Sequence, residues 1–150
     1  MIRLSRAGKR VAQITRGAVV AHVRRGDYAA TAAAKSTFGE LSTNYYLEAL
    51  EALGASVADT VFFTDDVTHV MREFGVSRTS VIGRADLASP LETVVAMGLA
   101  PSIVIPNSTF SWWASEMVRP KGRVVAPQRW FLDRSEESSP VRSEWIRVAN

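Results

Sequence analysis

The sequence contains no cysteine and only two histidines, His22 and His69. The lack of cysteine excludes disulfides and thiolate metal sites and fits a reducing compartment. Two isolated histidines are too few to form a metal centre of their own. No apolar run approaches the roughly 20 residues that cross a bilayer, and no signal-peptide pattern is visible at Met1. Glycine-rich dinucleotide motifs and P-loops are also missing, which disfavours the common NAD and ATP enzymes.

Lysine is scarce as well, so arginine supplies most of the 18 basic residues. The net charge is +3 and the isoelectric point is about 9.7, but the arginines are spread along the chain without a basic run. This distribution does not favour nucleic acid over smaller anions as a partner. The apolar fraction of 47% and the charged fraction of 22% are typical of a globular domain. With 150 residues, we expect a single domain over 1–150.

Strand and helix patterns alternate along the chain. Short apolar runs predict strands at 17–23, 60–64, 79–82, 102–105, 123–126 and 144–148. Apolar residues at helical spacing predict helices at 43–53, 67–74, 89–99 and 111–118, with Thr43, Asp66 and Ser89 as caps. The segment 29–41 is expected to be a loop, and the stretch 1–16 is basic and amphipathic but indicates no particular role. The alternation predicts an α/β fold, a Rossmann-like parallel sheet with helices on both faces.

Polar groups follow the predicted strands at one rim of the sheet. In parallel sheets, ligands bind outside the carboxyl ends of the strands, where the strand order reverses. The unusual residues fall there, at 24–27, 65–66, 86, 107–111 and 128–130. Five separate loops that bring polar side chains to the same rim predict a binding site.

Two adjacent arginines end the first strand. The two-residue period of a strand places His22 and Arg24 on one side, whereas Arg25 points elsewhere, and we expect it to pair with Asp27. Arginine holds phosphate with a planar, permanently charged fork of donors. The alternative is a solvated arginine pair after an edge strand.

The fourth loop leads into a helix through small hydroxyl residues. A helix start offers free N–H groups and partial positive charge, so the loop 107–111 could hold an anion. Alternatively, Ser108 simply caps the helix. Asp66 and Glu92 are explained as capping residues, and Asp65 could orient a hydroxyl, hold Arg24 or lie in solvent.

Four motifs together resemble bacterial α1,2-fucosyltransferases over about 19–131: HVRRGDY (22–28), FTDD (63–66), NSTFSWW (107–113) and VAPQRWF (125–131). Tyr45 and Tyr46 resemble the paired tyrosines of that family. The resemblance implies that this chain is the GDP-fucose-binding C-terminal half of a GT-B glycosyltransferase. It also implies an inverting, metal-independent transfer of fucose to the 2-hydroxyl of a galactoside.

The family's functional residues map onto positions of this chain. The resemblance implies that Arg24 holds the β-phosphate with His22 beside it, and that Asp27 also belongs to the catalytic group. The implied donor-binding residues are Arg25, Asp65, Asp66, Glu92, Asn107, Ser108, Thr109, Phe110 and Ser111. The expected partners are GDP-fucose and a galactoside acceptor, with no nucleic acid, no metal and no other cofactor.

The chain departs from the family pattern in two places. Glu92 is followed by Thr93, where related sequences carry an Asp-Leu pair. Only 21 residues precede His22, whereas the family carries a whole acceptor domain with a Gly-Asn-Gln segment ahead of the arginine motif. We therefore expect this chain to be the donor half of the enzyme, and such a half could self-associate. We also expect a cytoplasmic protein that lies peripherally at the inner membrane. The alternatives are a non-catalytic or truncated GDP-sugar-binding module and, less well supported, a receiver-type signalling domain.

Overall fold

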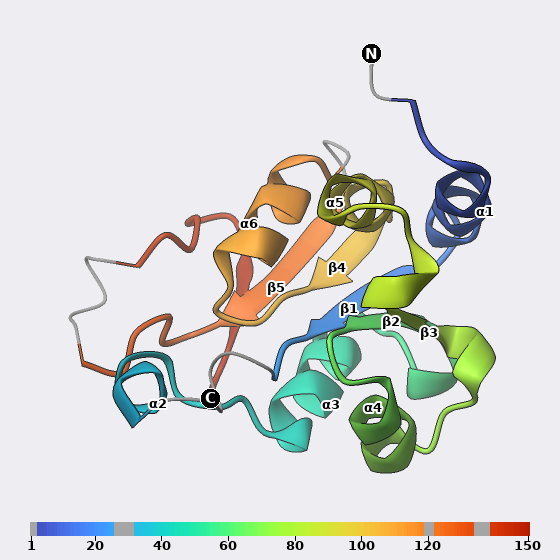
Figure 1. The fold of residues 1–150 in the computed structure, drawn as a ribbon. Helices are drawn as coiled ribbons and strands as arrows, with labels where there is room; N and C mark the ends of the chain where they lie inside the picture. Colours follow the sequence, from blue (N-terminus) through green and yellow to red (C-terminus); the bar gives the residue numbers. More distant parts are fainter. Residues whose placement is uncertain (1–2, 26–31, 119–121, 134–138) are drawn as a thin grey trace.

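The computed structural model describes residues 3–25, 32–118, 122–133 and 139–150, which contain one six-stranded parallel sheet (Figure 1). The strand order is β3-β2-β1-β4-β5-β6. The strands are β1 (Val19–Val23), β2 (Thr60–Thr64), β3 (Val81–Gly83), β4 (Ser102–Val104), β5 (Arg123–Pro127) and β6 (Ile146–Val148). This is the order of the Rossmann fold, so the predicted fold class is confirmed. The order reverses between β1 and β4, where a ligand site is expected.

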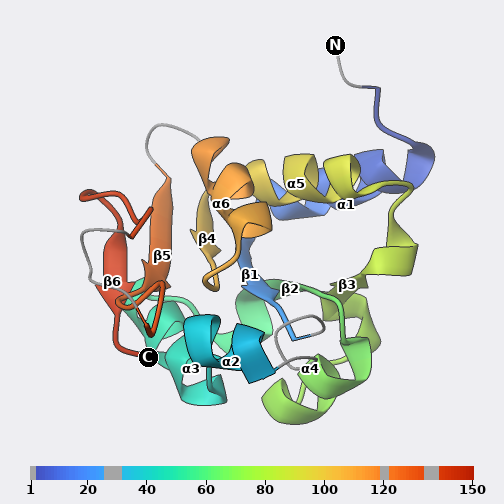
Figure 2. The same cartoon turned by 60° about the vertical axis from the view of Figure 1, so that its left-hand side comes forward.

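Helices cover both faces of the sheet. The helices are α1 (Arg6–Thr15), α2 (Ala32–Phe38), α3 (Thr43–Ala52), α4 (Val67–Phe74), α5 (Pro90–Gly98) and α6 (Thr109–Glu116), with short 3-10 turns at Val57–Asp59, Arg78–Ser80 and Arg84–Asp86. Helices α1, α5 and α6 lie on one face, and α3 and α4 lie on the other (Figures 1 and 2). The α2 segment joins the loop after β5, where Leu132 N–H donates to Thr37 O at 2.7 Å.

Local capping explains where the helices begin and end. Asp66 caps α4 by accepting from His69 N–H at 2.9 Å, and Gly75 ends it in the left-handed region with a φ of 64°. Ser89 caps α5 by accepting from Glu92 N–H at 3.3 Å. Both predictions are confirmed. Ser42 rather than Thr43 caps α3, because its hydroxyl accepts from Tyr45 N–H.

Two parts of the chain differ from the sequence expectations. The prediction of a loop over 29–41 is wrong for 32–38, which form α2. Its sequence AAAKSTF has strong helix formers, and these outweigh the Ser and Thr residues that suggested a loop. The basic amphipathic N-terminal stretch, to which the sequence assigned no role, contains α1. Ser5 caps this helix by accepting from Gly8 N–H at 3.0 Å.

The central strand β1 is buried on both faces. Val20 packs in the core under α1, α5 and α6, together with Ala96, Met97 and Ala114. Ala21 and Val23 pack in the core under α3 and α4. Continuous burial is the pattern of a parallel sheet covered on both sides. His22 and Arg24 therefore continue the side of the strand that carries Val20, toward α5 and α6.

Candidate functional site

A cavity of about 360 Å³ lies at the carboxyl ends of β1, β2 and β3. The starts of α5 and α6 help to enclose it. It is lined by His22, Arg24, Phe63, Thr64, Asp65, Ile82, Gly83, Arg84, Leu87, Ala88, Ser89, Pro90, Thr93 and Phe110. We call this the rim cavity. Its position beside the β1–β4 reversal is where open α/β sheets bind ligands.

His22 lies in the wall of the rim cavity and is only 5% exposed. Its Nδ1 lies 2.6 Å from Oγ of Ser111, and its ring centroid lies 5.7 Å from that of Phe110. Burial lowers the pKa of His22 to about 4; Arg24 and Arg84 also lower it, while Asp65 opposes the shift. The imidazole is therefore neutral at pH 7. Because Ser111 takes Nδ1, Nε2 is the nitrogen left to meet a ligand.

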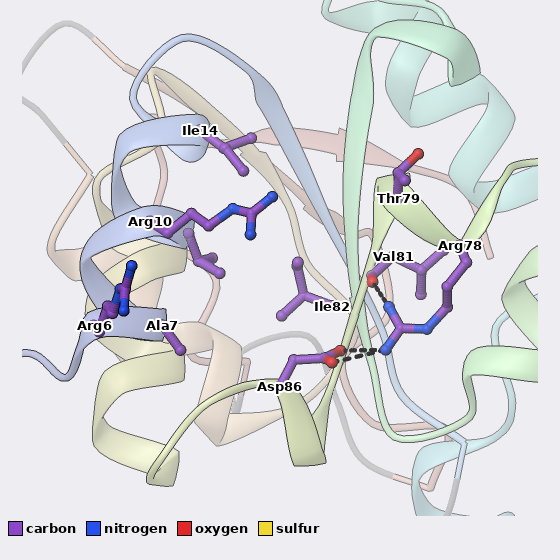
Figure 3. Close-up of a pocket in the computed structure, with 10 residues that line it drawn as sticks. Arg6, Ala7, Arg10, Ile14, Arg78, Thr79, Val81, Ile82 and Asp86 are labelled. Carbon is purple, nitrogen blue, oxygen red and sulfur yellow. Dashed lines mark hydrogen bonds and ion pairs between the residues drawn. The ribbon is translucent and has the colours of Figure 1, made fainter.

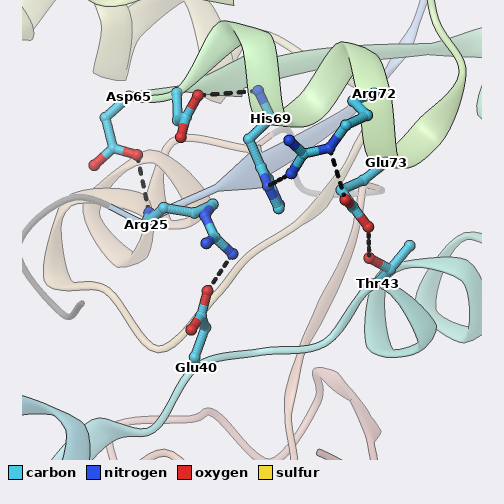
Figure 4. Close-up of polar contacts among 8 residues, drawn as sticks. Arg25, Glu40, Thr43, Asp65, His69, Arg72 and Glu73 are labelled. Carbon is cyan, nitrogen blue, oxygen red and sulfur yellow. Dashed lines mark hydrogen bonds and ion pairs between the residues drawn. The ribbon is translucent and has the colours of Figure 1, made fainter.

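Arg24 lines the same cavity as His22, as the strand period predicted. Arg25 does not line it. Figure 4 shows that the Arg25 guanidinium pairs with Glu40 and that its backbone N–H donates to Asp65 at 2.9 Å. The expected partner, Asp27, lies outside the described residues. The two arginines therefore have different surroundings. Arg24 faces the cavity, whereas Arg25 links the end of β1 to the segment before α3.

The two acids after β2 also separate. The Asp65 carboxylate lines the rim cavity, accepts from Arg25 N–H and forms an ion pair with Arg84 at 3.5 Å. Its side chain is only 6% exposed, whereas that of Arg84 is 68% exposed. Asp66 instead caps α4, as one of the two interpretations predicted. Arg84 was missed as a candidate, although its position just after β3 marks it as a rim residue.

The loop before α6 contributes unequally to the site. Phe110 lines the rim cavity, and Thr109 is exposed. Ser108 occupies the N-cap position, but its side chain makes no capping hydrogen bond. Ser111 is fully buried against His22 and does not line the cavity. Asn107 is buried too, and its amide donates to the carbonyls of Phe38 and, at 3.2 Å, Trp130.

Glu92 lies outside the rim cavity. Its carboxylate accepts from Ser5 N–H, from the Ser5 hydroxyl at 2.9 Å and from Ala88 N–H at 3.1 Å. These donors hold the pKa of Glu92 below its usual value, chiefly through the Ser5 N–H. Glu92, which the resemblance implies to be a donor-binding residue, thus forms a clasp between α5 and the start of α1 in this structure.

Two buried tyrosines on α3 support the strand ends that carry the site. The Tyr45 hydroxyl donates to Ile105 O at 2.6 Å, just after β4. The Tyr46 oxygen takes a hydrogen bond from the backbone of Arg24, just after β1. Burial raises the pKa of both phenols, so both stay protonated. The two tyrosines thus hold the ends of β1 and β4, the strands on either side of the order reversal, from the face of the sheet that α3 covers.

Comparison with known proteins now identifies the family. A model described as Glycosyl transferase family 11 matches residues 6–149. The chain belongs to glycosyl transferase family 11. This confirms, at the level of the family, the resemblance to α1,2-fucosyltransferases. No solved structure matches the chain.

Two curated relatives of this family 11 chain come from Escherichia coli. It is 28% identical to an alpha-1,2-colitosyltransferase over 141 residues, which is 87% of this chain and 47% of the relative. It is 27% identical to the O-antigen biosynthesis glycosyltransferase WbnK over 131 residues, covering 85% of this chain and 43% of the relative. The chain therefore spans about half the length of the curated relatives it matches.

In the part of the chain that the structure describes, no three His, Asp or Glu side chains gather in a way that could hold a metal ion. Among the same residues, no helix is long and apolar enough to cross a membrane.

Proposed function

We propose that the rim cavity binds the nucleotide-sugar donor, GDP-fucose, and that the whole protein transfers fucose to the 2-hydroxyl of a galactoside. One observation carries this proposal. Arg24 and His22 line the same cavity as the start of α6, beside the point where the strand order reverses. A guanidinium and the free N–H groups of a helix start are the groups that bind a diphosphate.

The other end of the cavity suits a nucleoside. Its lining there is apolar and comes from Ile82, Leu87 and Pro90, beside the hydroxyls of Ser89 and Thr93. Nucleotide sites combine such apolar walls with a few polar groups that fix orientation. We therefore place the base and ribose toward β3 and α5, and the diphosphate toward Arg24 and α6.

Inverting transfer at this site forms one bond and breaks one. The acceptor hydroxyl oxygen bonds to the anomeric carbon, the bond from that carbon to the β-phosphate oxygen breaks, and GDP leaves with the electron pair. The acceptor proton passes to a base. Arg24 stabilises the charge that develops on the departing diphosphate, and in the tautomer whose Nδ1 accepts from Ser111, Nε2–H of His22 donates to the same group. Such stabilisation can replace a metal ion, so we propose that donor binding needs none.

The transfer activity is proposed for the whole protein. The curated relatives are about twice as long as this chain, and one of them is an alpha-1,2-colitosyltransferase. The main alternative to our proposal is therefore a donor that carries a sugar other than fucose. Because the sugar lies beyond the diphosphate, the nucleotide part of the proposal can be tested independently of it.

Titration calorimetry tests the proposal. We expect GDP to bind in Mg²⁺ and equally in EDTA, and to bind at least about tenfold more tightly than UDP or dTDP. Binding that requires Mg²⁺ would overturn metal independence. Equal affinity for all three nucleotides, or none for GDP, would overturn the donor assignment. Titration of GDP-fucose against GDP-mannose then reports the sugar preference.

A further inference from the structure

The outer face of α1 carries a concentrated positive charge. Residues 3–16 contain Arg3, Arg6, Lys9, Arg10 and Arg16, and no acidic residue. All five side chains are exposed. In the described part of the chain, Arg6, Lys9 and Arg10 make no side-chain hydrogen bond or ion pair. We call these three residues the basic face.

The basic face is held rigidly on the domain. The inner side of α1 buries Gly8, Val11, Ala12 and Thr15. The buried carboxylate of Glu92 fixes the start of the helix through Ser5, and a Cβ on Gly8 would lie only 2.9 Å from that carboxylate. A helix anchored in this way presents its cations in one orientation, so the charge is a fixed surface of the fold.

A groove of about 780 Å³ runs between the basic face and β3. Figure 3 shows Arg10 and Ile14 reaching from α1 toward Val81 and Ile82, with Arg6 at the N-terminal end of the helix. Arg6, Arg10 and Ile14 follow one another at single-turn spacing along this side of α1. The groove thus has an apolar floor and a cationic rim.

The one carboxylate in the groove is already neutralised. Asp86 accepts two hydrogen bonds from Arg78, at 2.7 and 2.8 Å, and a third from Gly83 N–H at 2.6 Å. An incoming anion therefore meets Arg6 and Arg10 without an opposing free acid. The charge of the groove selects an anionic occupant.

An apolar side chain stands among these cations. Ile14 is 46% exposed on α1, and Leu91 is 54% exposed at the start of the neighbouring helix α5. Exposed apolar residues flanked by arginine and lysine are the composition of helices that lie in a membrane interface. An acidic soluble partner would match the cations, but it would leave the apolar floor of the groove unexplained.

We propose that α1 and its groove dock the protein on a bilayer rich in anionic phospholipid. The basic face contacts lipid phosphates, and Ile14 with the groove floor receives part of an acyl chain. The rim cavity and this groove share Ile82, so a docked protein holds its candidate site close to the membrane surface.

Vesicle co-sedimentation tests the proposal on the chain as it exists. The test variant is Arg6→Gln, Lys9→Gln, Arg10→Gln. The control variant is Arg72→Gln, Arg129→Gln, Arg147→Gln, which removes the same charge from exposed positions elsewhere. Each cation near an anionic surface is worth about fivefold in affinity, so the test variant should lose roughly a hundredfold on phosphatidylcholine–phosphatidylglycerol vesicles. The control should keep most of its affinity.

Several results would overturn the proposal. Equal loss in the two variants would mean that only net charge matters, and equal binding to pure phosphatidylcholine would remove the role of anionic lipid. Displacement from the vesicles by millimolar inorganic phosphate would indicate a site for free phosphate. Unchanged GDP affinity of the test variant by calorimetry keeps this result separate from the proposed donor site.

The absence of native cysteine permits a second readout. Ile14→Cys and, as a control on α4, Thr68→Cys can each carry a single polarity-sensitive dye. We expect the emission at position 14 to shift to the blue on anionic vesicles, while the dye at position 68 stays unchanged. Binding of polyglutamate with no blue shift on vesicles would instead assign the face to an acidic polypeptide and overturn the lipid assignment.

Discussion

Nδ1 of His22 lies 2.6 Å from Oγ of Ser111, and both side chains are buried. The contact joins the end of β1 to the first turn of α6, across the point where the strand order reverses. It fixes the imidazole against Phe110 and removes one nitrogen from contact with a ligand. One hydrogen bond between residues 89 positions apart thus ties β1 to α6 beside the candidate site.

The buried imidazole should make stability depend on pH. Its pKa is lowered from 6.5 to about 4, so the folded state resists protonation that the unfolded state accepts. The free energy of unfolding is therefore unaffected by the titration of His22 above pH 6.5. It falls by roughly 3 kcal/mol as the pH drops toward 4, because over this range only the unfolded state takes up the proton. Urea unfolding between pH 7 and 4 measures this, and the His22→Gln variant should lose that part of the slope. A His22→Gln variant with the wild-type slope would contradict the assignment.

Arg24 and Arg25 should differ sharply in nucleotide binding. Arg24→Ala removes a charge-assisted phosphate contact worth about 1.5–3 kcal/mol, so GDP affinity should fall at least about tenfold. Arg24→Lys should restore little, because the planar fork is lost. Arg25→Ala is the matched control and should change GDP affinity by no more than about threefold, since Arg25 pairs with partly exposed Glu40. Calorimetry that finds equal losses in the two alanine variants would refute the division between them.

The paired tyrosines should have separable effects. Tyr46→Phe removes the acceptor of the Arg24 backbone, and Tyr45→Phe removes the donor to Ile105 O. Each change removes a hydrogen-bond partner of a backbone group, and we expect a cost of about 1–3 kcal/mol in the free energy of unfolding. Only Tyr46→Phe should also weaken GDP binding, because it frees the segment that positions Arg24. A GDP affinity that is unchanged in Tyr46→Phe would mean that this hydrogen bond serves stability alone.

The Glu92 clasp should act on stability rather than on the ligand. Glu92→Gln weakens the bonds to Ser5 and Ala88, so the urea midpoint should fall, whereas the exposed change Glu48→Gln should leave it unaltered. The pKa of Glu92 is lowered, so its stabilising contribution is present at neutral pH and is lost as the carboxylate is protonated in acid. Lower GDP affinity in Glu92→Gln at unchanged stability would restore Glu92 as a donor contact.

Local signals predicted the fold well. Asp66 with Gly75 and Ser89 with Pro90 marked two helices through capping chemistry, and the run around Phe62 marked a buried strand. The sequence did not predict α2 or the docking of α1. Helix α1 depends on a tertiary contact, since its Ser5 cap is fixed by Glu92, 87 residues later. Local sequence does not reveal that contact, although the buried residues of α1, Gly8, Val11, Ala12 and Thr15, do recur at helical spacing.

The candidate site was predictable by position but not by partner. The two-residue period placed His22 and Arg24 together, and the strand ends placed Asp65 at the rim. Pairings such as Arg25 with Glu40 and Asn107 with Trp130 depend on loop paths that local sequence does not encode. The resemblance implied that Ser111 binds the donor, whereas its contact with His22 in the first turn of α6 was not predictable from local sequence.

The strand order also determines when the central strand can pair during folding. β1 pairs with β2 and β4, so Val19 can pair only once Thr60 on one side and Ser102 on the other have been synthesised. Contacts of such long range form slowly, because a large loop must close before any of them is made. During synthesis β1 therefore lacks its second neighbour, β4, until about two thirds of the chain has emerged. The strand order that creates the binding crevice therefore also leaves apolar surface of β1 exposed during synthesis, so we expect co-expression with chaperones to raise the soluble yield.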